Sequence, residues 1–114
     1  MNKRSAKKSI FLVDDEHDNN NLIFTIGLQD AGFEVDAYTD AELALSSFKP
    51  DYYDLLLLDI KMPMMDGFEL CTKISEVDLN VKICFITAGD INIDGLREVY
   101  PTLSTECFIK NQLQ

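Results

Sequence analysis

Apolar residues in this chain gather in short runs that alternate with segments of helical periodicity. The runs at 10–13 and 55–58 are apolar at every position, which is typical of strands buried on both faces of a parallel sheet. The expected strands are 9–13, 33–37, 54–58, 81–86 and 106–109. The expected helices are 18–31, 40–48, 66–75 and 93–100. This alternation predicts an α/β fold, with a parallel sheet, right-handed crossovers and helices on both faces.

Several residues mark where the expected helices begin and end. Gly32 is a suitable stop for the first helix. Thr39 and Glu42 form a capping-box pattern before the second, and Asp66 suits the N-terminus of the third. The fourth helix has the weakest pattern because Asp94-Gly95 lowers its propensity.

Composition limits the classes of protein to which the chain could belong. Its 114 residues, of which 46% are hydrophobic, are enough for one small domain with a core. No apolar stretch approaches the length needed to span a membrane, so we expect neither membrane insertion nor membrane binding. The net charge is −10, and all 20 acidic residues follow residue 13 with only six of the ten basic residues. Such a body repels nucleic acid, so direct nucleic acid binding is not expected.

The basic leader at 1–8 is interpreted as a flexible, solvated tail. It resembles a signal peptide only briefly, because Asp14 and the acidic residues after it interrupt the apolar segment. We therefore expect a cytoplasmic protein. Cys71, Cys84 and Cys107 lie far apart in apolar segments without a CxxC pair, which predicts reduced thiols in the core.

Carboxylates follow two of the predicted strands. Asp14 and Asp15 come directly after the first strand, and Asp59 ends the third. Since parallel strands deliver their carboxyl ends to one sheet edge, these side chains should form a ligand site there. Mg²⁺ prefers such oxygen ligands, and the backbone carbonyl of Lys61 could add another. The sequence thus predicts a site for Mg²⁺, with Mn²⁺ as the alternative ion.

The same edge has the groups needed for phosphoryl transfer to an aspartate. Asp59 can act as the nucleophile, and the chemistry then depends on positioning and charge neutralisation. Thr87 and Lys110 end two later apolar runs and could contact the phosphoryl oxygens. The small residue Ala88 would leave access for a bulky phosphodonor.

These residues together resemble the receiver domain of two-component response regulators. The resemblance rests on Asp14-Asp15-Glu16, on the segment from Asp59 to Gly67, and on Thr87-Ala88. Asp15 precedes Asp59 by 44 residues, and Thr87 follows Asp59 by 28, as in that family. The resemblance covers nearly the whole chain.

The resemblance implies a flavodoxin-like, doubly wound, five-stranded sheet of order 2-1-3-4-5. It further implies that Asp59 accepts a phosphoryl group from a histidine kinase or a phosphotransfer protein. Thr87 and an aromatic residue of the fifth strand would then shift and change the contact with a downstream protein target or output domain. The chain is accordingly expected to be a signalling module and not an enzyme.

The fifth strand departs from the family in a way that leaves two registers open. The family has an aromatic residue three positions before its Lys and usually a Pro directly after it. If Lys110 is that Lys, then Cys107 stands at the aromatic position. If Phe108 is the switch aromatic, then Asn111 stands at the Lys position. We favour Lys110, because a neutral Asn cannot replace its point charge.

The chain ends at Gln114, so the helix that follows the fifth strand in the family is expected to be missing or truncated. The expected organisation is a leader at 1–8 and, at 9–114, a receiver domain without its last helix. An uncovered flank of the sheet would then favour a homodimer.

Two other functions are compatible with parts of the pattern. An aspartyl-nucleophile phosphatase of the haloacid dehalogenase type would need an acid two residues after the nucleophile, where this chain has Lys61. A pseudo-receiver, which would bind proteins without being phosphorylated, is the stronger alternative because of the unusual fifth strand and the missing last helix.

Overall fold

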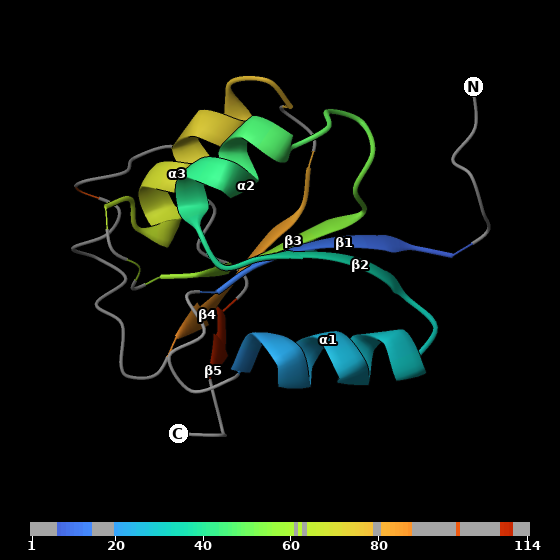
Figure 1. The fold of residues 1–114 in the computed structure, drawn as a ribbon. Coiled ribbons are helices and arrows are strands. Elements are labelled where there is room, and N and C mark those ends of the chain that lie inside the picture. Colours follow the sequence, from blue (N-terminus) through green and yellow to red (C-terminus); the bar gives the residue numbers. More distant parts are fainter. Residues whose placement is uncertain are drawn as a thin grey trace.

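The computed structural model describes residues 7–14, 20–60, 62, 64–78, 81–87, 98 and 108–110, with backbone only at 20–24, 87 and 108–110. Five parallel strands form one sheet in the order β2-β1-β3-β4-β5 (Figure 1). The strands are β1 (Ser9–Val13), β2 (Glu34–Tyr38), β3 (Leu55–Asp59), β4 (Ile83–Thr87) and β5 (Phe108–Lys110). The helices are α1 (Asn20–Asp30), α2 (Ala41–Ser47) and α3 (Gly67–Ser75).

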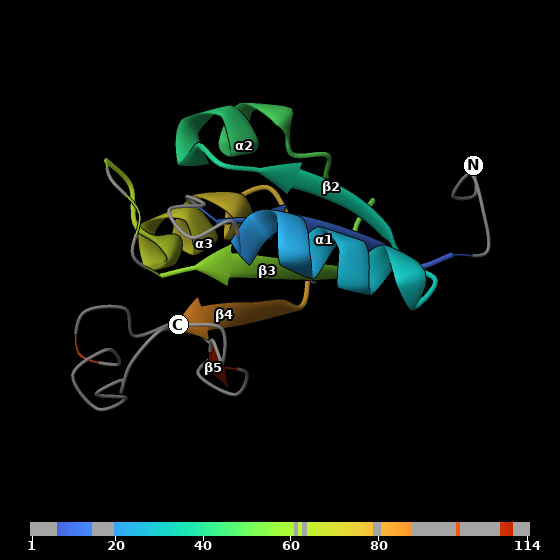
Figure 2. The same cartoon turned by 60° about the horizontal axis from the view of Figure 1, so that its bottom comes forward.

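Helices lie on both faces of the sheet, as the alternating pattern predicts. In Figure 1, α2 and α3 lie above the sheet and α1 lies below it. The view in Figure 2 shows β4 and β5 at the edge of the sheet opposite to β2. The expected α/β fold and strand order are therefore confirmed.

The central strands divide their side chains between two cores. On β1, Phe11 and Val13 pack on the side of α2 and α3, whereas Ile10 and Leu12 pack on the other side. All five residues of β1 are buried, so the expectation of a strand covered on both faces is confirmed. These cores fix the sheet, and the strand ends that form the site are fixed with it.

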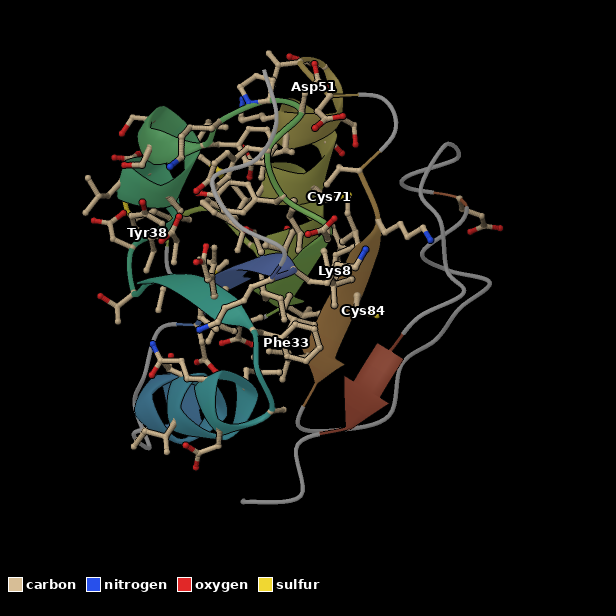
Figure 3. All side chains as sticks on the ribbon, turned by 90° about the vertical axis from the view of Figure 1, so that its right-hand side faces the viewer. Lys8, Phe33, Tyr38, Asp51, Cys71 and Cys84 are labelled. Carbon is tan, nitrogen blue, oxygen red and sulfur yellow. The ribbon has the colours of Figure 1, made fainter. Side chains whose placement is uncertain are left out.

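The cysteines differ from the expectation of three reduced core thiols. Cys71 is free and buried in the α3 layer, and Cys84 lies on β4 (Figure 3). Burial raises the pKa of the Cys71 thiol, and a hydrogen bond with Ser75 partly offsets this effect. Cys84 is disulfide-bonded, so the expectation is wrong for this residue. Cys107 lies outside the described residues.

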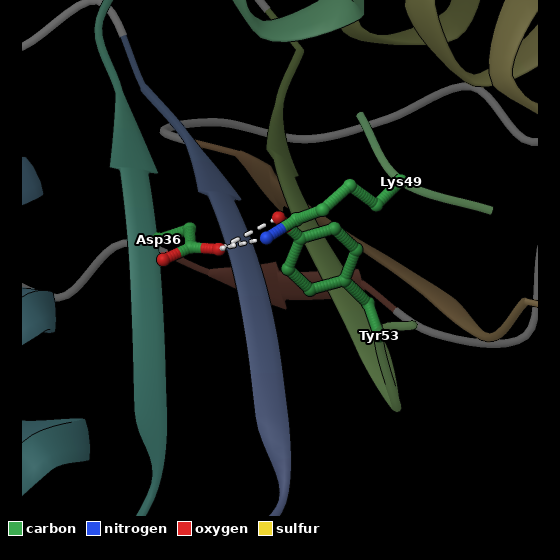
Figure 4. Close-up of polar contacts among 3 residues, drawn as sticks. All are labelled: Asp36, Lys49 and Tyr53. Atoms are coloured by element: carbon green, nitrogen blue, oxygen red, sulfur yellow. Dashed lines mark hydrogen bonds and ion pairs between the residues drawn. The ribbon is translucent and has the colours of Figure 1, made fainter. Parts of the chain in front are cut away.

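A polar contact ties β2 to the segment before β3. The hydroxyl of the buried Tyr53 donates a hydrogen bond of 2.7 Å to Asp36 Oδ2, and Lys49 Nζ lies 3.9 Å from the same oxygen (Figure 4). The Lys49 ammonium also stands 4.0 Å from the ring centroid of Tyr52. The ring of Tyr53 packs against Phe11, with 4.9 Å between centroids. The tyrosine thus joins the core to a surface ion pair.

Local capping agrees with the sequence at two of three helix ends. Gly32 has a φ of +100° just after α1, and the side chain of Asp66 caps α3. The N-cap of α2 is Asp40 and not Thr39, since the Asp40 carboxylate accepts hydrogen bonds from Glu42 N and Leu43 N. The capping box expected from Thr39 is therefore wrong by one residue. The helix expected at 93–100 lies outside the described residues, apart from the helical residue 98.

Within the part of the chain that the structure describes, no helix has the length and apolar character needed to cross a bilayer.

Candidate functional site

Two carboxylates lie side by side at the carboxyl edge of the sheet. The register of β1 and β3 pairs Val13 with Leu58, so Asp14 and Asp59 are the next aligned residues. Neighbouring strands are about 4.8 Å apart, which brings these two backbones close together. Asp14 is buried, with 4% of its surface exposed, and Asp59 is partly buried. The structure therefore brings together two of the three carboxylates expected from the sequence.

Backbone hydrogen bonds hold the main chain at Asp14 and directly after Asp59. Asp14 N donates to Tyr38 O of β2 at 3.0 Å, so its main chain continues the pairing of β1 beyond the strand end. On the other side, Ile60 N donates to Ile86 O of β4 at 3.1 Å. The residues before and after Asp59 are thus held by β1 and β4, which limits movement of its backbone.

Gly67 brings the start of α3 against the end of β3. Its N–H donates to Ile60 O at 2.9 Å, and a Cβ placed at Gly67 would collide with the carbonyl oxygen of Asp59. Only a residue without a side chain permits this approach. The sequence pattern includes Gly67 in the motif that begins at Asp59 but does not indicate this close approach. Its place directly after the helix cap Asp66 is the one local signal of it.

The described residues of the loop between β3 and α3 include one that is highly exposed, Met64, between the buried Ile60 and Met65. Met64 has a φ of +72°, a region that side-chain-bearing residues seldom occupy, and 89% of its surface is exposed. Asp66 then begins α3, and its Oδ1 accepts a hydrogen bond of 2.8 Å from Glu69 N. The loop is therefore held at the helix end, while Met64 projects into solvent.

The ends of β4 and β5 lie at the same edge. Their register pairs Thr87 with Lys110 and Phe85 with Phe108. Since β4 also neighbours β3, the backbones of Asp14, Asp59, Thr87 and Lys110 end along one side of the sheet. Of the other expected site residues, Asp15, Lys61 and Ala88 lie outside the described residues, as does Asn111 of the alternative register.

The chemistry of the described donor set suits a hard cation. Asp14 and Asp59 supply carboxylate oxygens, which are the ligands that hard cations such as Mg²⁺ prefer. Across the residues whose side chains are described, no group of three His, Cys, Asp or Glu is placed to hold a metal ion. A complete ion site would thus need ligands beyond this pair, and Asp15 and the Lys61 carbonyl are the ones that the sequence predicts.

Comparison with known proteins identifies the family. Residues 10–101 match the model of the response regulator receiver domain. The chain is 39% identical over 83 residues to the sensor protein EvgS of Escherichia coli strain K12, covering 73% of this chain and 7% of EvgS. It is 36% identical over 80 residues to the response regulator receiver protein CpdR of Brucella abortus, covering 70% of this chain and 66% of CpdR. The chain thus spans less than two thirds of either relative.

Solved structures show the same fold. The response regulator TrrA of Thermotoga maritima, in complex with Mg²⁺ and BeF, is 28% identical with a TM-score of 0.74. That match covers 94% of this chain and 89% of TrrA. The response regulator StyR is 31% identical with a TM-score of 0.76, covering 96% of this chain and 54% of StyR. The sequence match and the shared fold agree: the chain belongs to the receiver domain family of response regulators.

Proposed function

We propose that this chain is a phosphorylatable receiver domain in which Asp59 accepts a phosphoryl group from a histidine kinase or a phosphotransfer protein. The observation that carries the proposal is the alignment of Asp14 with Asp59 at the carboxyl edge of the sheet. A pair of carboxylates on adjacent strand ends, one buried and one partly buried, is costly unless a cation offsets its charge. Such a cation site is what phosphoryl transfer to an aspartate requires.

In this transfer, an oxygen of the Asp59 carboxylate bonds to the phosphorus of a phosphohistidine. The phosphorus–nitrogen bond breaks, and the donor imidazole leaves with the bonding electron pair. Asp59 is held for this attack by the neighbouring strands, so little reorganisation of its backbone is needed. The proposed roles of Thr87 and Lys110 are a hydrogen bond and a positive charge for the phosphoryl oxygens, and their paired strand ends support these roles.

The residues proposed to hold Mg²⁺, or Mn²⁺, are Asp14, Asp15, Asp59 and the backbone carbonyl of Lys61. When bound, the ion would neutralise negative charge on the carboxylates and the phosphoryl oxygens. The complex of TrrA with Mg²⁺ and BeF, in a relative with 28% identity, supports this ion. A downstream protein target or an output domain would read the phosphorylated state.

Intact mass measurement after incubation with a small phosphodonor tests this proposal. The wild-type chain should gain one phosphoryl group only when Mg²⁺ is present, and Asp59→Asn should gain none. Asp30→Asn is the matched control, because Asp30 is an exposed residue at the end of α1, remote from the strand ends. It removes the same charge and should be phosphorylated like the wild type.

A folded wild-type chain that gains no phosphoryl group would contradict the proposal and favour the pseudo-receiver. Circular dichroism of the same samples establishes that the chain is folded. A phosphoryl adduct that persists in Asp59→Asn would place the acceptor on another residue and also contradict the assignment.

A further inference from the structure

The outward side of β2, from Glu34 to Tyr38, is an edge of the sheet and is here called the β2 edge. In Figure 4, β2 (teal) is the outermost strand and β1 (blue) lies beside it, as the strand order requires. We propose that the β2 edge binds an extended segment of a partner protein as an added strand, and that basic and apolar residues alternate in this segment. This surface is separate from the strand ends that hold Asp59.

Hydrogen bonds between β1 and β2 show which backbone groups of β2 face outward. Glu34 N donates to Lys8 O at 2.9 Å, and Tyr38 O accepts from Asp14 N at 3.0 Å. Along a strand in a parallel pair, alternate residues bond to the same neighbour. The even-numbered residues of β2 therefore bond to β1, and the odd-numbered residues direct their N–H and C=O groups away from it.

The outward-facing residues are Val35 and Ala37. Each carries one donor and one acceptor, and no other described residue forms a backbone hydrogen bond with either of them. Ala37 is exposed, so the strand is open to solvent at this residue. Two outward residues about 6.6 Å apart match the spacing at which an added parallel or antiparallel strand forms hydrogen bonds.

The β2 edge lacks features that commonly prevent such pairing. Natural edge strands are often protected by Lys, Pro, a bulge or short length. Residues 34–38 contain neither Lys nor Pro, and their register with β1 continues over five residues without a bulge. The strand at the opposite edge, β5, has only three residues. We therefore expect an added strand at β2.

The two faces of β2 determine which side chains an added strand would need. Tyr38 packs on the side of α2 and α3, and Val35 packs on the side of α1. Alternation places Glu34 and Asp36 on the same face as Tyr38, and Ala37 on the same face as Val35. Residues of an added strand lie beside those of β2 on each face. One face of the segment should thus be basic and the other apolar.

The acidic face keeps an excess of negative charge. Lys49 Nζ lies 3.9 Å from Asp36 Oδ2, so one ammonium group accompanies the carboxylates of Glu34 and Asp36. The side chain of Asp36 is 38% exposed, which leaves it accessible to a basic side chain from an added strand.

The same charges argue against a second copy of this chain as the occupant. Antiparallel pairing of two β2 strands centred on Asp36 would place this residue opposite itself. A register centred on Val35 would place Glu34 opposite Asp36, and one centred on Ala37 would place Glu34 opposite Asp40. Like charges directly opposite one another destabilise a strand pair. A segment of opposite charge is therefore favoured.

Fluorescence anisotropy with a labelled heptapeptide of alternating Lys and Val tests the charge and the pattern. Binding should be saturable, and a peptide of alternating Glu and Val should bind at least about tenfold more weakly because its charges repel those of β2. Equal binding of the two peptides, or no binding of the Lys–Val peptide, would overturn the proposal.

A proline at position 37 tests the role of the backbone. Ala37→Pro removes an outward N–H and leaves the hydrogen bonds to β1 in place, so it should weaken binding of the Lys–Val peptide at least about tenfold. Ala37→Ser is the matched control, because it changes the side chain, keeps the N–H and should bind like the wild type. Equal affinity of Ala37→Pro and the wild type would overturn pairing at this edge.

Amide hydrogen exchange of the wild-type chain locates the peptide even if Ala37→Pro does not fold. The Lys–Val peptide should slow exchange at Val35 and Ala37 more than at Asp36, which already bonds to β1. Protection only at other strands or helices would overturn the proposal. Protection of Val35 and Ala37 that rises with protein concentration, without peptide, would assign the edge to a second copy and also overturn it. Neither Mg²⁺ nor a phosphodonor is present, so the result does not depend on phosphorylation of Asp59.

Discussion

Adding one methyl group at Gly67 should destabilise the domain, because the start of α3 lies against the main chain of β3. The Cβ of Gly67→Ala would collide with the Asp59 carbonyl oxygen and stand 3.0 Å from the Asp59 carbonyl carbon. Both atoms belong to a strand held on two sides, so they cannot turn away as a flexible side chain could. Overpacking of this kind costs about 1–3 kcal/mol. The lower entropy of the unfolded alanine chain offsets about 0.5 kcal/mol of this.

We therefore expect Gly67→Ala to lower the free energy of unfolding by about 2 kcal/mol, or the Tm by about 10 °C. Urea and thermal denaturation measure both quantities. Gly27→Ala is the matched control, because Gly27 is exposed in α1 and a Cβ there would meet no atom within 4 Å. That variant should be more stable by about 0.5–1 kcal/mol. If both variants gained stability, the tight approach of α3 to Asp59 would be refuted.

Three smaller changes test other contacts of the described structure. Tyr53→Phe keeps the ring and removes the 2.7 Å hydrogen bond to the partly exposed Asp36. Urea denaturation should show a free energy of unfolding lower by about 1 kcal/mol, and an unchanged midpoint would contradict a contribution of this hydrogen bond to stability. Asp66→Ala removes the acceptor for Glu69 N and should also lower the free energy of unfolding by about 1 kcal/mol. Asp66→Asn keeps an acceptor oxygen and should retain most of that stability, so equal losses in the two variants would contradict helix capping by Asp66. Burial raises the pKa of the Cys71 thiol, so less thiolate is present at neutral pH. Alkylation of Cys71 should therefore be slower in the native chain than in the unfolded chain, and its rate should increase only at a higher pH than for an ordinary thiol; equal rates in the two states would contradict the shift.

Most of the fold could be predicted because its signals are local. A fully apolar run such as that before Asp59 specifies a strand buried on both faces, and its observed end differs from the expected one by a single residue. The alignment of Asp14 with Asp59 followed from the rule that parallel strands end at a common edge. Neither inference needed knowledge of a contact between distant segments.

The features that sequence reasoning missed depend on such contacts. The role of Gly67 arises from a main-chain approach to β3 that propensity does not encode. Thr39 and Asp40 are both suitable caps by residue type, and only the structure shows that Asp40 is the one used. The disulfide bond of Cys84 was not predicted either, because the spacing of cysteines along a sequence does not specify their pairing. Among the site residues, Asp15 lies outside the described part of the chain and stays a prediction.

The register of β5 bears on which residue stands at the functional Lys position. Lys110 pairs with Thr87 at the carboxyl end of β4, so the main chain of Lys110 reaches the sheet edge that also holds Asp59. The register with Phe108 as the switch aromatic would instead need Asn111 at that position, and a neutral Asn cannot replace the point charge of a Lys. The observed pairing therefore agrees with the register that places Lys110 at the site, although Cys107 then occupies the sequence position of the expected aromatic residue.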